Sequence, residues 1–335
     1  MPPVIKVDDV AYPTLQVPDL ALQEKFLIDF GMTTVERSEH ALYMRGNGSD
    51  PFLHVSVPGE KKFLGTTFRA ASMEDLERLS KTESFGDVEP LKSPGGGYRV
   101  SGQDPDGIGV AVAWGIQPRE DSDPIEHPDF NVGGDDRQGF RRINRIKRFR
   151  KGGYPRIKRY GHFGINVKDI QAAFDWYHAH LGIIASDFLR PGGKDGPLFG
   201  IFARCDRGKK LADHHSIFFL AADMHSEGVS GLNHVSFETF DIDDVFMGHE
   251  ILKKQGYEPE WGIGRHYQGS QIFDYWRSPF HQIHEHQTDG DVFDNTVPPE
   301  IVDITQDGDP QNPEIGPSQW GPAINIETFG DKRGI

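Results

Sequence analysis

The sequence predicts an α+β fold built from a duplicated domain, because three kinds of segment occur once in each half of the chain. The first is an alternating apolar strand, a Val-x-Asp turn, an amphipathic helix and a glycine at the helix end. The second is a strand that runs into a helix, and the third is a turn that enters a strand. The matched segments are 12–32 with 162–183, 63–81 with 232–256, and 104–114 with 277–287.

The first pair of segments agrees closely. YPTLQVPDLALQEKFLIDFGM (12–32) aligns with HFGINVKDIQAAFDWYHAHLGI (162–183), and each half then continues through a second unit of strand, helix and further strands. Units of about 50–75 residues are too long for a solenoid repeat. The matched residues are Val17 with Val167, Asp19 with Asp169 and, after a slip of one residue, Gly31 with Gly182.

The repeat divides the chain into four parts. We expect a first domain over 1–140, a basic linker over 141–159, a second domain over 160–290 and an extended tail over 291–335. The tail is rich in Pro, Gly, Asn and Asp and has no strand or helix periodicity, so we expect it to pack over the second domain or to be partly disordered.

Composition indicates a soluble, cytosolic protein. The 335 residues contain one cysteine, Cys205, which excludes an internal disulfide and a cysteine-based zinc cage and fits a reducing compartment. The N-terminus has no charged region followed by an apolar one, so no signal peptide is expected. No apolar run approaches the roughly 18–20 residues that span a bilayer, so we expect no membrane association.

Charge argues against nucleic acid as a partner, because the formal net charge is −15. One segment departs from this average: RRINRIKRFRKGGYPRIKR (141–159) holds ten basic residues and no acidic ones. Such a run could bind an anion. Its position at a domain boundary favours a solvated linker that pairs with the acidic domains or with a neighbouring subunit, and we expect a homo-oligomer.

The two halves differ in what their matched strands carry. The second half presents His162, His234 and Glu285, which can all bind a metal ion. The matched positions of the first half are Tyr12, Gly65 and Ala111. A single histidine on an apolar strand is more often a core residue than a ligand, but three ligand-type residues at matched positions of a repeat favour a metal site in the second domain.

Two imidazoles and one carboxylate favour a particular class of metal. They leave three adjacent positions open on an octahedral ion, as in the facial triad of non-haem Fe(II) oxygenases. Zinc more often has a fourth protein ligand or one open water position, and Ca²⁺ prefers oxygen ligands alone. We therefore expect Fe(II), with Mn(II) as the second choice.

Several segments resemble the type I extradiol catechol dioxygenases of the vicinal oxygen chelate superfamily, which also contains the glyoxalases. YGHFGINVKDI, GLNHVSFE and IHEHQTDGD resemble the three ligand segments of that family. The resemblance implies four βαβββ modules, paired into two partly open barrels, with Glu285 as the carboxylate ligand. Its neighbours His284 and His286 alternate to the other face of the strand, so we expect them to be structural.

The resemblance also implies three catalytic residues. GRHYQGSQIFDYW (264–276) resembles a family segment whose histidine and tyrosine, here His266 and Tyr275, hydrogen-bond the catechol oxygens. DHHSIFFL (213–220) matches the strand with the acid–base histidine, which we assign to His215, with His214 turned away. The implied activity is insertion of O₂ beside the diol of a small aromatic substrate. The entry turn of the last strand departs from the family pattern, with SPFHQ in the second half where the first half has DPDG (104–107).

Three alternatives remain. A non-redox metalloenzyme of the same superfamily, such as a glyoxalase or an epimerase, usually draws four ligands from both paired modules. A metal-free ligand-binding protein on the same fold would not need the three ligands. A cupin or another histidine-rich oxygenase on an unrelated fold is disfavoured by the repeat. Metal content and oxygen uptake with catechols would separate these readings.

Overall fold

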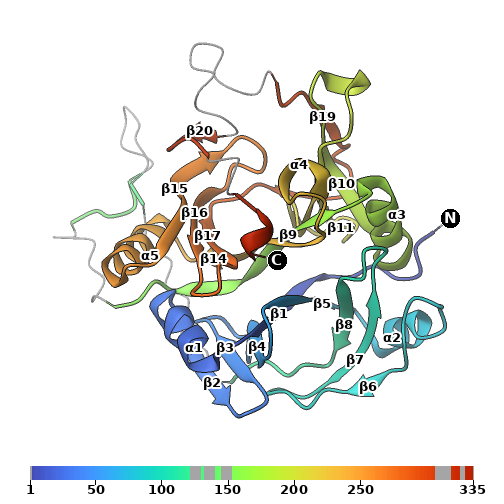
Figure 1. Ribbon diagram of the computed structural model, residues 1–335, viewed down its shortest axis with the longest axis horizontal. Helices are drawn as coiled ribbons and strands as arrows, with labels where there is room; N and C mark the ends of the chain where they lie inside the picture. The colour runs from blue at the N-terminus through green and yellow to red at the C-terminus, as the bar shows by residue number, and fades with distance from the viewer. Residues whose placement is uncertain are drawn as a thin grey trace.

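The computed structural model describes residues 2–120, 130–131, 140–144, 153–305, 318–324 and 329–334. The described residues form two large twisted β-sheets that lie against each other, one from each half (Figure 1). The central part of the basic segment 141–159 and two stretches of the tail fall outside the described residues. Within the described helices, none is long and apolar enough to cross a membrane.

The first half contributes one eight-stranded sheet and two helices. The elements in chain order are β1 Asp9–Val17, α1 Leu20–Asp29, β2 Thr33–Arg37, β3 Leu42–Arg45, β4 His54–Pro58, β5 Lys62–Arg69, α2 Met73–Leu79, β6 Glu89–Pro90, β7 Tyr98–Gln103 and β8 Gly109–Trp114.

The second half contributes a ten-stranded sheet, three α-helices and a small two-stranded sheet. Its elements are β9 Ile157–Val167, α3 Ile170–Leu181, β10 Ile183–Leu189, η1 Gly193–Asp195, β11 Gly200–Cys205, β12 Ala212–Asp213, β13 Ile217–Ala221, α4 Ala222–His225, β14 Gly231–Thr239, α5 Ile242–Gln255, β15 Glu258–His266, β16 Ile272–Arg277, β17 Ile283–Thr288, β18 Val292–Phe293, β19 Glu300–Val302, β20 Ser318–Trp320 and η3 Lys332–Gly334.

Both sheets are assembled from two βαβββ modules. The first sheet has the order β2-β3-β4-β1-β5-β8-β7-β6, and the second has β10-β11-β13-β9-β14-β17-β16-β15 between the added edge strands β19 and β20. In each sheet the first strands of the two modules, β1 with β5 and β9 with β14, pair antiparallel at the centre. The predicted α+β fold with duplicated βαβββ modules is therefore confirmed.

Sheet register confirms the matched positions of the two halves. Tyr12 pairs with Thr67, which pairs with Ala111. In the second sheet His162 pairs with Ser236, which pairs with Glu285. His234 lies opposite Gly164, as Gly65 lies opposite Thr14. The equivalences inferred from sequence thus hold in space at all three positions.

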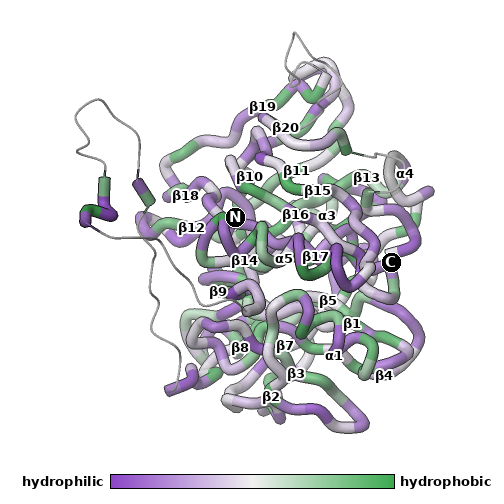
Figure 2. The backbone as a smooth tube through the Cα atoms, turned by 90° about the vertical axis from the view of Figure 1, so that its left-hand side faces the viewer, coloured by the Kyte–Doolittle hydropathy of each residue, from purple (hydrophilic) through white to green (hydrophobic). Residues whose placement is uncertain are grey.

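The repeated Val-x-Asp turn starts a helix in both halves. Asp19 accepts hydrogen bonds from the backbone N–H groups of Ala21 and Leu22 at the start of α1, and Asp169 accepts from Ala172 at the start of α3. A carboxylate at this position satisfies N–H groups that have no partner within the helix. Gly182 ends α3 in the left-handed conformation, with φ of 71°. In Figure 2 hydrophobic stretches run along strands such as β10 and β11.

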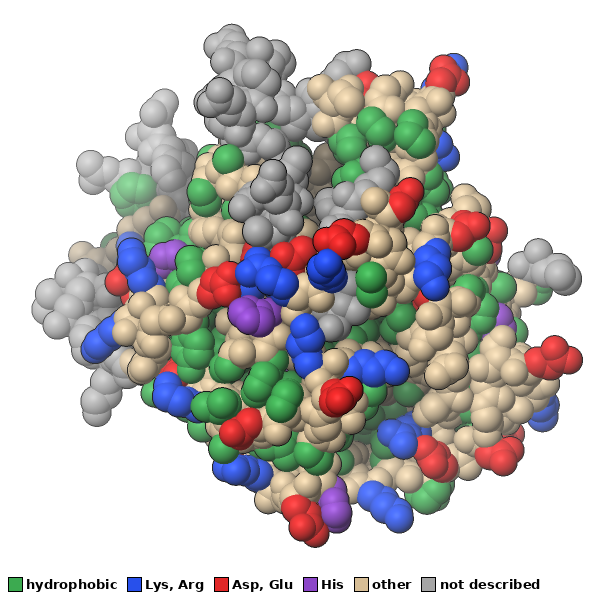
Figure 3. Space-filling view, viewed as in Figure 1, with side chains coloured by type: hydrophobic (Ala, Val, Ile, Leu, Met, Phe, Trp, Pro, Cys, Tyr) green, Lys and Arg blue, Asp and Glu red, His purple; other side chains and the backbone are tan. Residues whose placement is uncertain are grey.

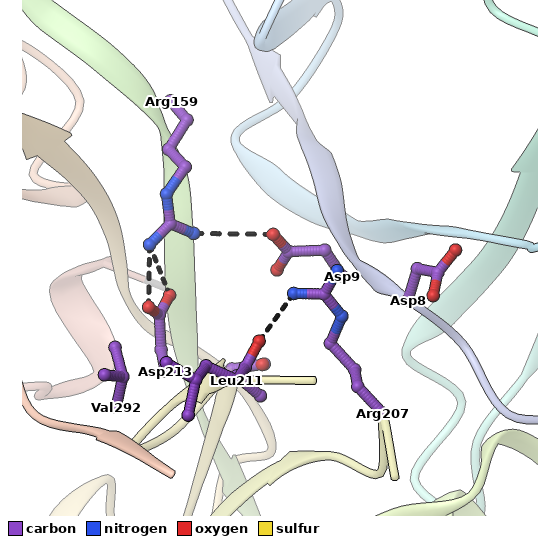
Figure 4. Close-up of a pocket in the computed structure, with 9 residues that line it drawn as sticks. Asp8, Asp9, Arg159, Arg207, Leu211, Asp213 and Val292 are labelled. Atoms are coloured by element: carbon purple, nitrogen blue, oxygen red, sulfur yellow. Dashed lines mark hydrogen bonds and ion pairs between the residues drawn. The ribbon is translucent and has the colours of Figure 1, made fainter. Parts of the chain in front are cut away.

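A cavity lined by charged residues lies between the two halves. It has a volume of about 230 Å³, and Arg159 of β9 reaches into it (Figure 4). The Arg159 guanidinium lies 2.6 Å from Asp213, 2.5 Å from Glu238 and 3.4 Å from Asp9, which belongs to the first half. Burial raises the pKa of Asp9 to about 6, although Arg159 opposes the shift.

The end of the basic segment is therefore part of the second sheet. β9 begins at Ile157, and its basic residues Lys158 and Arg159 both pair with acidic side chains, Lys158 with Glu238 at 2.6 Å. On the face shown in Figure 3, acidic and basic side chains occur side by side across the middle of the molecule.

The tail contributes strands, which its composition did not indicate. β19 extends the second sheet beside β10, and β20 extends the opposite edge beside β15. Both are only three residues long, too short to produce a periodic pattern. The tail thus covers the two edges of the second sheet.

Candidate metal centre

Three adjacent strands bring the predicted ligands together. His162 lies on β9, His234 on β14 and Glu285 on β17, and these strands are neighbours in the second sheet. All three side chains are buried, and each offers one ligand atom within 4.8 Å of the others. In the described part of the chain this is the group of side chains that could hold a metal ion.

The distances suit adjacent positions on one ion. His162 Nε2 lies 3.1 Å from His234 Nε2 and 3.0 Å from Glu285 Oε2, and His234 Nε2 lies 3.8 Å from the same oxygen. Metal–ligand bonds of about 2.1 Å at right angles separate two ligand atoms by about 3 Å. The trio therefore has the spacing of three ligands on one face of an ion.

The burial of the Glu285 carboxylate also favours a bound cation. Glu285 is fully buried, and neither of its oxygens accepts a hydrogen bond of regular geometry from a described residue. A buried carboxylate is costly unless a positive charge compensates it. Burial lowers the pKa of His162 and of His234 to about 3, so both imidazoles are neutral at pH 7, as metal ligands must be.

His266 and Tyr275 lie beside the trio. His266 Nε2 is 3.0 Å from the Tyr275 hydroxyl and 3.9 Å from Glu285 Oε1. Burial, and then the Glu285 carboxylate, raise the pKa of Tyr275 well above its usual value. Tyr275 thus keeps its proton and can donate a hydrogen bond into the site.

The sequence is similar to those of known proteins. Residues 159–281 match the model of the Glyoxalase/Bleomycin resistance protein/Dioxygenase superfamily. This match covers most of the second half of the chain. Metapyrocatechase 2 of Cupriavidus necator is 26% identical over 287 residues, which cover 85% of this chain and 82% of that protein.

Two solved structures show the same fold along almost the whole chain. The Mn(II)-bound glyoxalase from Novosphingobium aromaticivorans has a TM-score of 0.72 at 22% identity, over 95% of this chain and 92% of that one. Homoprotocatechuate 2,3-dioxygenase from Arthrobacter globiformis has a TM-score of 0.70 at 17% identity, over 91% and 87%. The chain therefore has the vicinal oxygen chelate fold of this superfamily in both halves.

His215 faces the ligand trio, and His214 does not. The His215 ring lies 4.2 Å from the His162 ring between centroids. His214 instead contacts Asp187 of β10, with 2.8 Å between Nε2 and Oδ2, while its Nδ1 lies 3.1 Å from His215 Nδ1. In the tautomer in which His215 Nδ1–H donates to His214 Nδ1, the His215 Nε2 lone pair is left for the site.

The histidines that flank Glu285 face the first half. His284 Nε2 lies 3.3 Å from His54 Nε2, and its Nδ1 lies 3.1 Å from the Gln282 carbonyl oxygen. His286 Nε2 donates to the Phe30 carbonyl at 2.7 Å, and its ring stacks on Phe30 at 3.7 Å. Strand alternation thus puts Glu285 in the site and its neighbours in the interface, as we expected for structural residues.

Aromatic side chains surround the polar groups. Trp261 and Phe329 lie 5.7 and 5.1 Å from the Tyr275 ring, and Phe202 lies 4.7 Å from the His215 ring. The sequence pattern missed Phe329 and Asp187. Neither belongs to a recognisable motif, and their contacts depend on how the tail and β10 pack.

Proposed function

We propose that this protein is an extradiol ring-cleaving dioxygenase, with Fe(II) or Mn(II) bound by His162, His234 and Glu285. One observation carries the proposal: a buried His-His-Glu trio with unsatisfied carboxylate oxygens has His215, His266 and Tyr275 directly around it. The relationship to metapyrocatechase 2 supports it. When bound, the ion would supply a Lewis acid for the diol and an electron path between the aromatic ring and O₂.

The surrounding residues would bind and orient the aromatic diol. Trp261 and Phe329 present apolar surfaces that suit an aromatic ring and exclude water. Tyr275 would donate a hydrogen bond to one diol oxygen, and His266 would hold the Tyr275 hydroxyl in place at 3.0 Å. Donors fixed in a buried site stabilise charge that develops on such an oxygen.

His215 would transfer the protons. Its Nε2 is the free nitrogen of the ring, because its Nδ1 is engaged by His214. His215 would take a proton from the diol at Nε2 and return it to the ring-opened product. Asp187 and His214 would keep the ring in this tautomer, in the way that a carboxylate orients a catalytic imidazole.

A glyoxalase-like activity is the second candidate, because the Mn(II)-bound glyoxalase has the same fold. Such sites usually take four ligands from both paired modules. Here both modules also contribute, but the described residues offer three ligands rather than four, and Tyr275 and His266 lie beside them.

The test is reconstitution under nitrogen with Fe(II) or Mn(II), followed by a panel of substituted catechols in air. We expect oxygen uptake with formation of a yellow ring-opened product. The same assay is run on His215→Asn, which should bind as much metal as the wild type and lose most of the turnover. Isomerisation of a hemithioacetal without oxygen uptake would contradict the proposal and favour the glyoxalase-like alternative.

A further inference from the structure

A chain of buried amides joins the ligand His234 to the segment Phe329–Gly334, here called the C-terminal latch. His234 Nδ1 lies 2.7 Å from Asn233 Oδ1, and Asn233 Nδ2 lies 3.4 Å from Asn166 Oδ1. Asn166 Nδ2 lies 2.9 Å from the Gly330 carbonyl oxygen. Both asparagines have no exposed surface. Figures 1 and 2 show the end of the chain beside β17.

The Gly330 carbonyl sets the direction of every hydrogen bond in this chain. A carbonyl oxygen only accepts, so Asn166 must turn its NH₂ group toward Gly330 and its oxygen toward Asn233. Asn233 then donates to Asn166 and presents its own oxygen to His234. His234 must therefore carry its proton on Nδ1, which leaves the Nε2 lone pair facing His162 and Glu285. The latch thus selects the tautomer that can bind a metal.

Close packing around residue 330 of the latch leaves room for glycine alone. Gly330 has φ of +69°, and a Cβ atom there would lie 1.8 Å from Asn233 Nδ2. Phe329 packs on the same group of residues, with its ring 6.1 Å from His234 and 5.1 Å from Tyr275 between centroids. The latch therefore contacts the site through both its backbone and its first side chain.

Polar contacts anchor the rest of the latch to both halves. Asp331 Oδ1 lies 3.5 Å from the fully buried Arg277 guanidinium, and Arg333 lies 3.2 Å from Glu258. Lys61, from the first half, donates to the Arg333 carbonyl. These contacts hold the Gly330 carbonyl at Asn166.

We propose that Asn166, Asn233 and the C-terminal latch position His234, so that metal binding and latch docking strengthen each other. The inference rests on the proposed metal centre, although not on ring cleavage. Outer groups that orient a metal-ligating histidine typically contribute 10–100-fold to metal affinity. Because coupling between two binding events is reciprocal, the bound ion should hold the latch more tightly.

The first test measures Mn(II) affinity by competition titration of the full chain. Asn166→Ala removes the link between Gly330 and Asn233, and Gly330→Ala displaces Asn233, so each should weaken binding about 10–100-fold. Gly107→Ala is the matched control, since Gly107 has φ of +81° in the first half with open space around its Cβ position. It should leave the affinity unchanged. Unchanged affinity in both Asn166→Ala and Gly330→Ala would overturn the inference.

The second test measures docking of the latch directly. Hydrogen exchange of peptides that cover residues 329–334 should slow when Mn(II) is added to the metal-free wild type, and should not slow in Asn166→Ala. If the exchange rate of these peptides in the wild type does not change when Mn(II) is added, the inference is also overturned. Metal-dependent protection in a protein that opens no catechol would leave this inference intact and refute the proposed dioxygenase activity. Failure of the wild type to bind Mn(II) or Fe(II) would remove the metal centre and the inference together.

Discussion

The two halves share a backbone plan but differ at each position that surrounds the candidate site. His162, His234 and Glu285 correspond in sheet register to Tyr12, Gly65 and Ala111. By the same register Tyr275 corresponds to Ser101, His215 to Phe52, Asn233 to Leu64 and Asn166 to Gln16. The Phe52 ring packs 4.7 Å from Tyr12, much as His215 lies 4.2 Å from His162. At these two positions the first half has aromatic rings in contact where the second half has histidines.

The backbone has also diverged at one of these positions. Gly65 has φ of +128°, and a Cβ there would lie 1.8 Å from the Gly109 carbonyl oxygen. A histidine at this position would therefore be strained and would collide with β8. Three substitutions alone could not rebuild the site in the first half, which means that a site requires the strand geometry as well as the ligands.

The largest expected effect is loss of the ligand trio. His234→Ala or Glu285→Ala should remove the metal and the ring-opening activity, because water cannot replace a fixed ligand without loss of geometry. Tyr12→Phe, at the position equivalent to His162, should lower stability by about 1 kcal/mol through loss of the hydrogen bond with Thr67 and leave metal content intact. Elemental analysis and steady-state assays check both. Full activity and metal content in His234→Ala would refute the assignment.

His215→Asn should produce the next largest effect. Turnover should fall by about 10²–10⁴-fold with metal retained, since a positioned proton-transfer group is lost. His214→Asn should cost about 10–100-fold, because His214 acts only through His215. Phe52→Leu, at the equivalent place in the first half, should leave turnover per bound metal unchanged. The proton-transfer role of both histidines is excluded if neither variant loses even tenfold.

Arg159→Gln tests how the two halves are held together. Arg159 and Asp9 occupy equivalent positions of the repeat and face each other at 3.4 Å. The substitution removes the Arg159 cation from Asp9 and Asp213, whereas Glu238 keeps its pair with Lys158. Unfolding free energy should drop by about 3 kcal/mol. Arg37→Gln, which breaks an exposed pair with Glu24, should cost less than about 1 kcal/mol. Denaturant titrations measure the unfolding free energy of the two variants. Equal losses would show that the Arg159 cluster stabilises the protein no more than an exposed ion pair does.

The smallest effect concerns the DPDG turn that only the first half retains. Burial raises the pKa of Asp104 to about 6, above its unfolded value near 4. The folded protein therefore binds this proton more tightly, and stability falls as pH rises between about 4 and 6. Asp104→Asn removes that dependence, so the variant should gain relative to wild type as pH rises through this window. Urea titrations at pH 4.5 and 7 measure it, with the exposed Asp87→Asn as the matched control.

Periodicity and repeat matching predicted the modules and the ligand trio because both depend on local patterns. Val17, Asp19 and their matches mark a strand, a turn and a helix cap within a few residues. The sequence did not predict β19, β20, Phe329 or the role of Asn233. These depend on contacts between segments far apart in the chain, such as Asn166 with Gly330, which no local pattern encodes. The boundaries of the four parts and the homo-oligomer stay predictions.

The most direct test of the proposed centre relates activity to bound iron. Metal-free protein would be loaded with increasing Fe(II) under nitrogen, and initial rates of catechol opening plotted against iron bound per chain. We expect the initial rate to rise linearly until one iron is bound per chain, and not to rise in Glu285→Ala. A rise that continues to two irons, or a Glu285→Ala protein that follows the wild-type line, would contradict a single centre in the second half.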